Sequence, residues 1–198
     1  KNIKSKEICQ QYITIGKVVK FEFTKGSTCV NYVTFTAKKT VGKTTAIVEE
    51  LKEKSILTPN GPEGEVYKYI NIWIGKDSFA NSKNIENATV GFKVSKDWVK
   101  KNNININSLV LQHFSDKKWN PLPTKKIGED DKYICFEAET PSFSPFAITA
   151  EKNKVVIEEK EGENKCSAVA SQEEKGGADE KSNTSQENDN RIISKIAT

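Results

Sequence analysis

The sequence predicts an all-β fold, an Ig-like antiparallel β-sandwich with one short helical turn and a polar C-terminal tail. Apolar and polar residues alternate with a period of two through most of the first 150 residues, as in strands that bury one face. Turn residues recur between these stretches at near-regular spacing, which is typical of a sandwich or barrel. A doubly wound fold needs helical patterns of roughly 10–15 residues between its strands, and the sequence has none.

About eight short strands are expected in chain order. The first stretch, Tyr12–Phe23, has Gly16-Lys17 near its middle, where a bend or bulge is expected. Two polar segments, Ser55–Glu65 and Lys76–Asn87, are expected to be long loops. The remaining strands are expected at Cys29–Ala37, Thr44–Leu51, Val66–Gly75, Ala88–Ser95, Ser108–Asp116, Lys132–Glu139 and Ser144–Ala150.

One short helical turn is expected at Ser95–Asn103. Ser95 is a favourable N-cap, and Lys100-Lys101 lie near the end of the segment, where cations complement the helix dipole. We expect the strands and this turn to share one core. The aromatic residues expected to be mostly buried are Phe21, Phe35, Tyr69, Trp73, Phe92, Trp98, Phe136 and Phe146.

Composition divides the chain of 198 residues into a globular domain, 1–150, and a charged linker or tail, 151–198. All seventeen aromatic residues lie in the first part, which has 23 Lys and Arg against 16 Asp and Glu, a net charge of +7. The second part has 8 against 11, a net charge of −3. A charged segment without aromatic residues cannot bury enough apolar surface to offset its ordering entropy.

A short stretch, Gly42-Lys43-Thr44, matches the last three letters of a phosphate-binding P-loop. That motif needs a glycine five residues earlier, where this chain has Ala37, and it must open a helix. The flanking residues alternate as in strands, so a glycine-containing hairpin turn is expected, with no nucleotide bound. The lysines are spread along every strand rather than gathered in a patch with aromatic residues, so no nucleic-acid binding is expected.

We expect no enzymatic activity, cofactor or metal. Glu49 and Glu50 are adjacent on a strand and point to opposite faces, so they cannot act as an acid/base pair. The acidic segment Glu129–Asp131 is expected to be a solvated turn, since its spacing does not match a calcium loop. His113 has no serine or aspartate that the sequence places beside it, and a partly buried strand histidine is expected.

The cysteines and the glycosylation sequons are compatible with export. With one histidine and no CxxC spacing, a zinc site is not expected. At least one disulfide is expected, and the sequence leaves its pairing open among Cys9, Cys29, Cys135 and Cys166. Two Asn-x-Thr/Ser sequons are candidate N-glycosylation sites, at Asn87 and Asn183.

Four blocks of sequence resemble the PGF-pre-PGF domain of archaeal cell-surface proteins, and the resemblance covers about residues 15–150. They are "PEGEVYKYINIWIG", "NIENATVGFKVSKDWVKKNNIN", "LVLQHFSDKKWNPLPT" and "SFSPFAIT". This chain departs from the family at Ser142, where Gly is frequent before Phe-Ser-Pro-Phe, and at His113, where Arg is frequent.

The resemblance implies an extracellular or cell-surface location, a charged linker after the domain, and no catalytic residues. Its partners would be copies of itself or other envelope proteins, with a membrane contact only through an anchor absent from this chain. The leading hypothesis is a non-catalytic structural module of the archaeal surface. It would assemble into a filament by exchange of a terminal strand, because Glu7–Ile15 has strand composition.

The alternative is a carbohydrate-binding or adhesion domain. Aromatic rings stack on the apolar faces of sugars, and three tryptophans are available. Trp73 and Trp98 are expected to be core residues, whereas Trp119, in "DKKWNPLP", is expected to be partly exposed. A ligand site would need at least two rings that face solvent in a concave surface.

Overall fold

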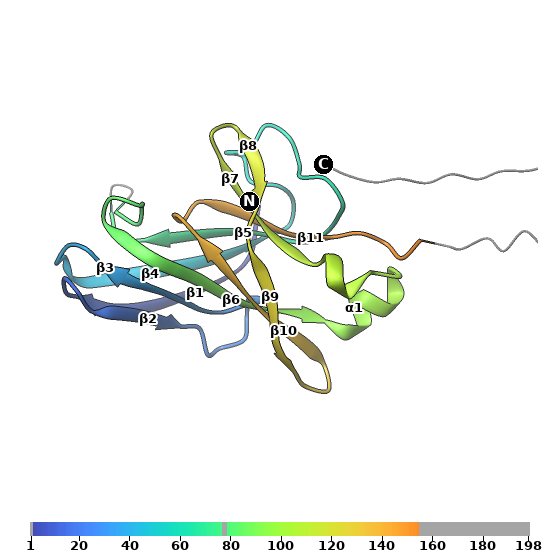
Figure 1. Cartoon of the computed structure of the whole chain (residues 1–198), viewed down its shortest axis with the longest axis horizontal. Coiled ribbons are helices and arrows are strands. Elements are labelled where there is room, and N and C mark those ends of the chain that lie inside the picture. Colours follow the sequence, from blue (N-terminus) through green and yellow to red (C-terminus); the bar gives the residue numbers. More distant parts are fainter. Residues whose placement is uncertain (1, 77–78, 155–198) are drawn as a thin grey trace, which may run out of the picture. The chain divides into compact units, whose positions relative to one another are not determined.

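The computed structural model describes residues 2–76 and 79–154, which form two antiparallel sheets (Figure 1). Sheet A has the strand order β1-β4-β5-β11-β7-β8, and sheet B has the order β2-β3-β6-β10-β9. The strands are β1 (Ile3–Ile13), β2 (Val18–Glu22), β3 (Val30–Ala37), β4 (Gly42–Leu51), β5 (Glu65–Ile74), β6 (Ile85–Ser95), β7 (Val110–Ser115), β8 (Lys118–Pro121), β9 (Thr124–Glu129), β10 (Tyr133–Thr140) and β11 (Pro145–Ala150).

This architecture confirms the predicted all-β sandwich. The other predicted strands are present, but Tyr12–Phe23 is not one bent strand. It contains the end of β1, which begins at Ile3 in sheet A, and the separate strand β2 of sheet B. Two short edge strands, β8 and β9, are not among the predicted strands, because neither shows apolar alternation. In β9 every residue after Thr124 is exposed, so the hydrophobic signal is missing.

The predicted hairpin at Val41-Gly42 is wrong in its topology. A turn does occur there, with Gly42 at a φ of +82°, but it joins β3 of sheet B to β4 of sheet A. Gly42 and Lys43 then pair with Ile13 and Tyr12 of β1. The segment therefore begins a strand rather than a helix, and its backbone does not form a P-loop.

The predicted helical turn is confirmed as α1 (Lys96–Lys101), which lies at the end of β6 (Figure 1). The Ser95 hydroxyl accepts a hydrogen bond from the Trp98 N–H at 3.4 Å, as an N-cap does. A single 3₁₀ turn, η1 (Ile106–Ser108), precedes β7.

The core lies between the two sheets and is built by alternating residues of both. Five of the eight aromatic residues predicted in it are buried, namely Phe21, Phe35, Phe92, Phe136 and Phe146. Tyr69 is half-buried, as is Trp98, whose ring packs against Tyr67 at 4.8 Å between centroids. The prediction for Trp73 is wrong, because its side chain is 39% exposed.

The end of the domain lies slightly beyond residue 150. The Asn105 N–H donates to the Glu151 carbonyl at 2.8 Å, and Lys152 forms an isolated bridge with Ile104. These contacts attach the segment after β11 to the region around η1. The predicted tail lies outside the described residues from 155 onward.

Candidate interaction surfaces

The strand β1 is the edge of sheet A. It pairs with β4 through ten residue positions, and no described strand pairs with its other side. Two large apolar side chains on it are exposed, Ile8 at 53% and Tyr12 at 73%. A long edge strand with exposed apolar side chains is a template for pairing with another chain.

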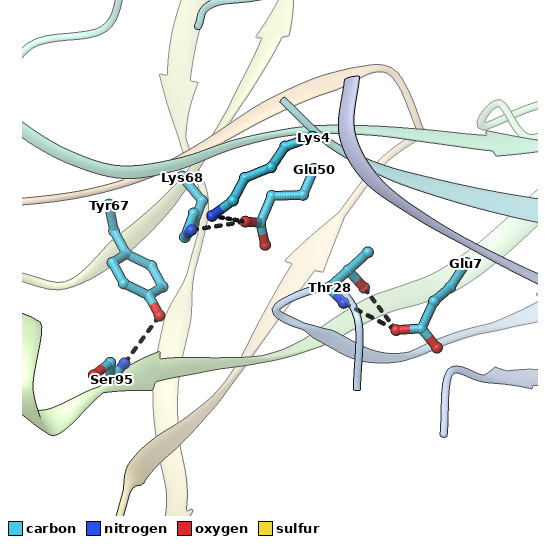
Figure 2. A network of polar contacts seen from close by, with 7 residues as sticks. All are labelled: Lys4, Glu7, Thr28, Glu50, Tyr67, Lys68 and Ser95. Atoms are coloured by element: carbon cyan, nitrogen blue, oxygen red, sulfur yellow. Dashed lines mark hydrogen bonds and ion pairs between the residues drawn. The ribbon is translucent and has the colours of Figure 1, made fainter. Parts of the chain in front are cut away.

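The inward side of β1 holds a buried carboxylate, Glu7, which is 3% exposed. It accepts hydrogen bonds from the backbone N–H of Lys25 at 3.1 Å and of Thr28 at 3.0 Å. The Thr28 hydroxyl also donates to it, at 3.3 Å (Figure 2). Because Glu7 satisfies buried donors in the loop between β2 and β3, it attaches the edge strand of sheet A to sheet B.

A second buried carboxylate, Glu50, lies beside the beginning of β1 (Figure 2). Its Oε1 is 2.7 Å from the Lys68 Nζ and 3.3 Å from the Lys4 Nζ. Burial acts to lower the pKa of Lys68, but the hydrogen bond and charge of Glu50 outweigh it and the pKa is raised. β1 therefore contacts its own domain through charged groups at its beginning, Lys4, and near its middle, Glu7.

The outer face of sheet A next to β1 is apolar. Ile8 of β1 lies opposite Ile47 of β4, which lies opposite Trp73 of β5. The Trp73 indole N–H donates to the Glu49 Oε2 at 3.2 Å, which fixes the exposed ring on this face. Two exposed residues of the loop between β4 and β5, Ile56 and Leu57, line a pocket of about 430 Å³ together with Trp73. We call Ile8, Ile47, Ile56, Leu57 and Trp73 the apolar face of sheet A.

At the opposite edge of sheet A, Trp119 of β8 is half-buried, as predicted. It lies directly across from Phe114 of β7. Both rings line a cleft of about 560 Å³, whose other wall is the segment 59–64. Two half-buried aromatic rings therefore line one concave surface, and the predicted ligand site at Trp119 stays a prediction.

The cysteines differ in burial. Cys29 is buried in the core, and burial raises the pKa of its thiol well above its usual range. Cys9 and Cys135 are half-buried, and none of these three forms a disulfide within the described part of the chain. The fourth cysteine, Cys166, lies outside the described residues, so the predicted disulfide stays a prediction.

The first sequon lies on β6, where Asn87 is exposed with a φ of +50°. The hydroxyl of its third residue, Thr89, forms a hydrogen bond of 2.7 Å with that of Thr34. Asn87 is thus accessible for glycosylation. The second sequon, at Asn183, lies outside the described residues.

His113 has a neighbour that the sequence did not reveal. Its Nε2 is 2.5 Å from the Ser144 hydroxyl, which donates its own proton to the Phe114 carbonyl at 2.9 Å. The Ser144 hydroxyl has one proton, so while it donates that proton to the Phe114 carbonyl, the imidazole Nε2 is the donor to Ser144. His113 is 1% exposed and stacks on Phe146, and burial lowers its pKa to about 4 against the opposing charge of Asp116.

Of the acidic residues expected in a solvated turn, Glu129 lies in β9 and forms ion pairs with Lys96 and Lys126, whereas Asp130 makes turn contacts. The Asp130 carboxylate accepts from the backbone N–H of Lys132 and of Tyr133, and these hydrogen bonds lower its pKa. No group of three metal-ligating side chains occurs among residues 2–76 and 79–154. No helix in that part of the chain is long and apolar enough to cross a membrane.

Comparison of the chain with protein-family models, with curated proteins and with solved structures finds no match. The resemblance to the PGF-pre-PGF domain therefore remains a prediction.

Proposed function

We propose that this domain is a non-catalytic structural module of the archaeal cell surface that associates with further copies of itself through β1. The observation on which the proposal depends is the side of β1 with which no described strand pairs, where Ile8 and Tyr12 are exposed. Backbone N–H and C=O groups on a free edge can pair with a strand of another copy. Ile8 also belongs to the apolar face of sheet A, so the two surfaces are continuous.

Two modes of association are compatible with this edge. In strand addition, β1 of one copy pairs with an edge of the next while it stays on its own β4. In strand exchange, β1 leaves its own β4 and occupies the same place in a neighbour. Glu7, Lys4 and Ile13 would then make their contacts between chains. A head-to-tail contact of either kind that does not close produces a filament.

The first experiment is sedimentation velocity of the full chain over a wide concentration range. Removing β1 would also remove Glu7 and the fully buried Ile13, so substitutions on exposed positions are the sharper test. We expect the wild type to associate and the Ile8→Lys/Tyr12→Lys variant to remain monomeric. Ile127→Lys, on the exposed β9 edge of sheet B, is the matched control and should associate normally. A wild type that is monomeric at all concentrations would contradict the proposal.

A second experiment separates addition from exchange. Gln10 of β1 and Thr45 of β4 are cross-strand partners, and the Gln10 Nε2 donates to the Thr45 Oγ1 at 3.0 Å. After oxidation of a Gln10→Cys/Thr45→Cys variant, addition yields a disulfide within one chain and a monomer band on a non-reducing gel. Exchange yields covalently linked oligomers. The wild type and the two single variants control for linkage through the native cysteines.

The surface location is tested through the sequons. Protein isolated from its native cells should have glycan mass at Asn87, and the mass should disappear in Asn87→Gln. An unmodified Asn87 together with an unmodified Asn183 would remove this support for export.

The second candidate function, carbohydrate binding, is favoured by the cleft at Trp119 and does not depend on self-association.

A further inference from the structure

The cleft at Trp119 lies on the outer face of sheet A, at the edge opposite β1. Its floor consists of residues from β7, β8 and β11, and its wall is the segment 59–64 of the loop between β4 and β5. The floor residues are Val110, Gln112, Phe114, Trp119, Pro121 and Thr149. Its volume of about 560 Å³ lies in the range of small-molecule sites.

The two rings of the cleft are placed by a two-residue turn. Asp116 and Lys117 have φ values of +51° and +63°, as the two central residues of a type I′ hairpin require. This turn sets the register in which Phe114 pairs with Trp119. The rings are 5.3 Å apart and nearly edge to face, so the pair is held rigidly at the mouth of the hairpin.

The wall of the cleft is held against the sheet by side chains. The Trp119 indole N–H donates to the Asn60 carbonyl at 2.9 Å, and the Gln112 amide donates to the Glu63 carbonyl at 3.3 Å. Gly64, with a φ of +91°, lies so close to β11 that an added Cβ would be 2.9 Å from the Ala150 carbonyl oxygen. The cleft is therefore preformed, and a ligand would not have to order it.

The cleft is lined by equal numbers of positive and negative side chains, which can bind a ligand. Lys117, Lys118, Glu63 and Glu151 line it, and none of the four forms an ion pair with another described residue. The ammonium groups are donors and the carboxylates are acceptors. A sugar hydroxyl both donates and accepts, and it can use both kinds of group at once. Two positive and two negative groups give no preference for an acidic ligand.

We propose that this cleft binds a neutral saccharide, with the apolar face of a sugar ring stacked on Trp119, Phe114 in contact at its edge, and its hydroxyls bound by Glu63, Glu151 and the two lysines. The site is separate from β1 and from the apolar face of sheet A. Saccharide binding and self-association can therefore each occur without the other.

The test is isothermal titration calorimetry of the full chain with cellohexaose, mannohexaose and chitohexaose, and with polygalacturonate as the acidic comparison. We expect at least one neutral oligosaccharide to bind. Trp119→Ala should weaken that binding about tenfold or more, as loss of a central aromatic contact does. Trp73→Ala, which removes an exposed tryptophan of the same sheet outside the cleft, is the matched control and should leave the affinity unchanged.

A second variant distinguishes loss of a ligand contact from misfolding. Glu63 is exposed, so it can be changed without loss of packing. Glu63→Gln/Glu151→Gln should also weaken binding while the circular dichroism spectrum stays that of the wild type. In NMR spectra, saccharide should shift the Trp119 indole N–H signal and leave that of Trp73 in place. Absence of binding to all three neutral probes, binding to polygalacturonate alone, or equal affinities of wild type and Trp119→Ala would each overturn the proposal.

Discussion

Tyr32 of β3 lies flat across Gly91 of β6, so closely that a Cβ added to Gly91 would be 2.3 Å from a ring carbon. The ring is held by one contact at its hydroxyl and one over its face. Its hydroxyl donates to the Glu137 Oε2 at 2.7 Å, and the Lys20 Nζ lies 4.8 Å from its centroid. Burial, followed by the hydrogen bond with Glu137, raises the pKa of Tyr32, so the hydroxyl remains a donor at ordinary pH.

This contact predicts that Gly91→Ala lowers the free energy of unfolding by about 1–3 kcal/mol, the usual range for overpacking. The sign is informative, because Gly to Ala in a strand normally stabilises. Urea denaturation measures it. In a Tyr32→Ala background the same substitution should be neutral or stabilising, and an equal loss in both backgrounds would show that the ring is not the cause.

The buried histidine predicts a loss of stability in acid. The unfolded chain takes up a proton at His113 below about pH 6.5, whereas the folded chain takes it up only near pH 4. The contribution of His113 to stability is therefore complete above pH 6.5, declines as the pH falls, and is lost below pH 4, by about 3 kcal/mol in total.

Because His113 is the single histidine of the chain, its NMR signals report its pKa directly. We expect a value near 4, and one near 6.5 would refute the interpretation. Urea denaturation of His113→Gln should show a smaller decline than the wild type between pH 6.5 and pH 4.

The buried carboxylate of β1 predicts a further effect on stability. Glu7→Ala leaves the buried Thr28 N–H without an acceptor, so we expect a loss of about 2–3 kcal/mol in the free energy of unfolding. Glu53→Ala, at an exposed glutamate, is the control and should change stability by no more than about 0.5 kcal/mol. Equal effects of the two substitutions in urea denaturation would mean that the contacts of Glu7 do not stabilise the fold.

The hairpin between β7 and β8 predicts a stabilising substitution. Lys117 has a φ of +63°, which costs a non-glycine residue about 1–2 kcal/mol and glycine almost nothing. After the greater freedom of glycine in the unfolded chain is subtracted, we expect Lys117→Gly to stabilise by about 0.5 kcal/mol. Lys118→Gly, one residue later in β8, should destabilise instead. Thermal melts of the two variants compare them directly, and the prediction fails if both lower the melting temperature.

The outer-face position of Trp73 can be predicted from the sequence, whereas the strand β9 cannot. In β5 the residues Ile70, Ile72 and Ile74 alternate and are all buried. Period two then places Trp73 on the opposite face with Asn71, and that pattern alone could have identified it as an outer-face residue. The size and apolar character of Trp73 favour a core position, but its phase in the strand opposes one. For β9 no such signal exists, because its partner β10 rather than its own sequence holds it in the sheet.

The sequence by itself determined the local structure of this protein. The alternation, the turn residues and the Ser95 cap act over a few neighbouring positions, so the β-sandwich and α1 could be predicted from them. Only the tertiary structure decided which sheet each strand joins, because the β3–β4 turn can lead to either sheet. It also decided the contacts of Glu7 with Thr28, Tyr32 with Gly91, and His113 with Ser144. These pairs are far apart in the sequence. Strand pairing within a sheet brings Tyr32 beside Gly91 and His113 beside Ser144, and packing of the two sheets brings Glu7 beside Thr28, so no local sequence pattern predicts these contacts.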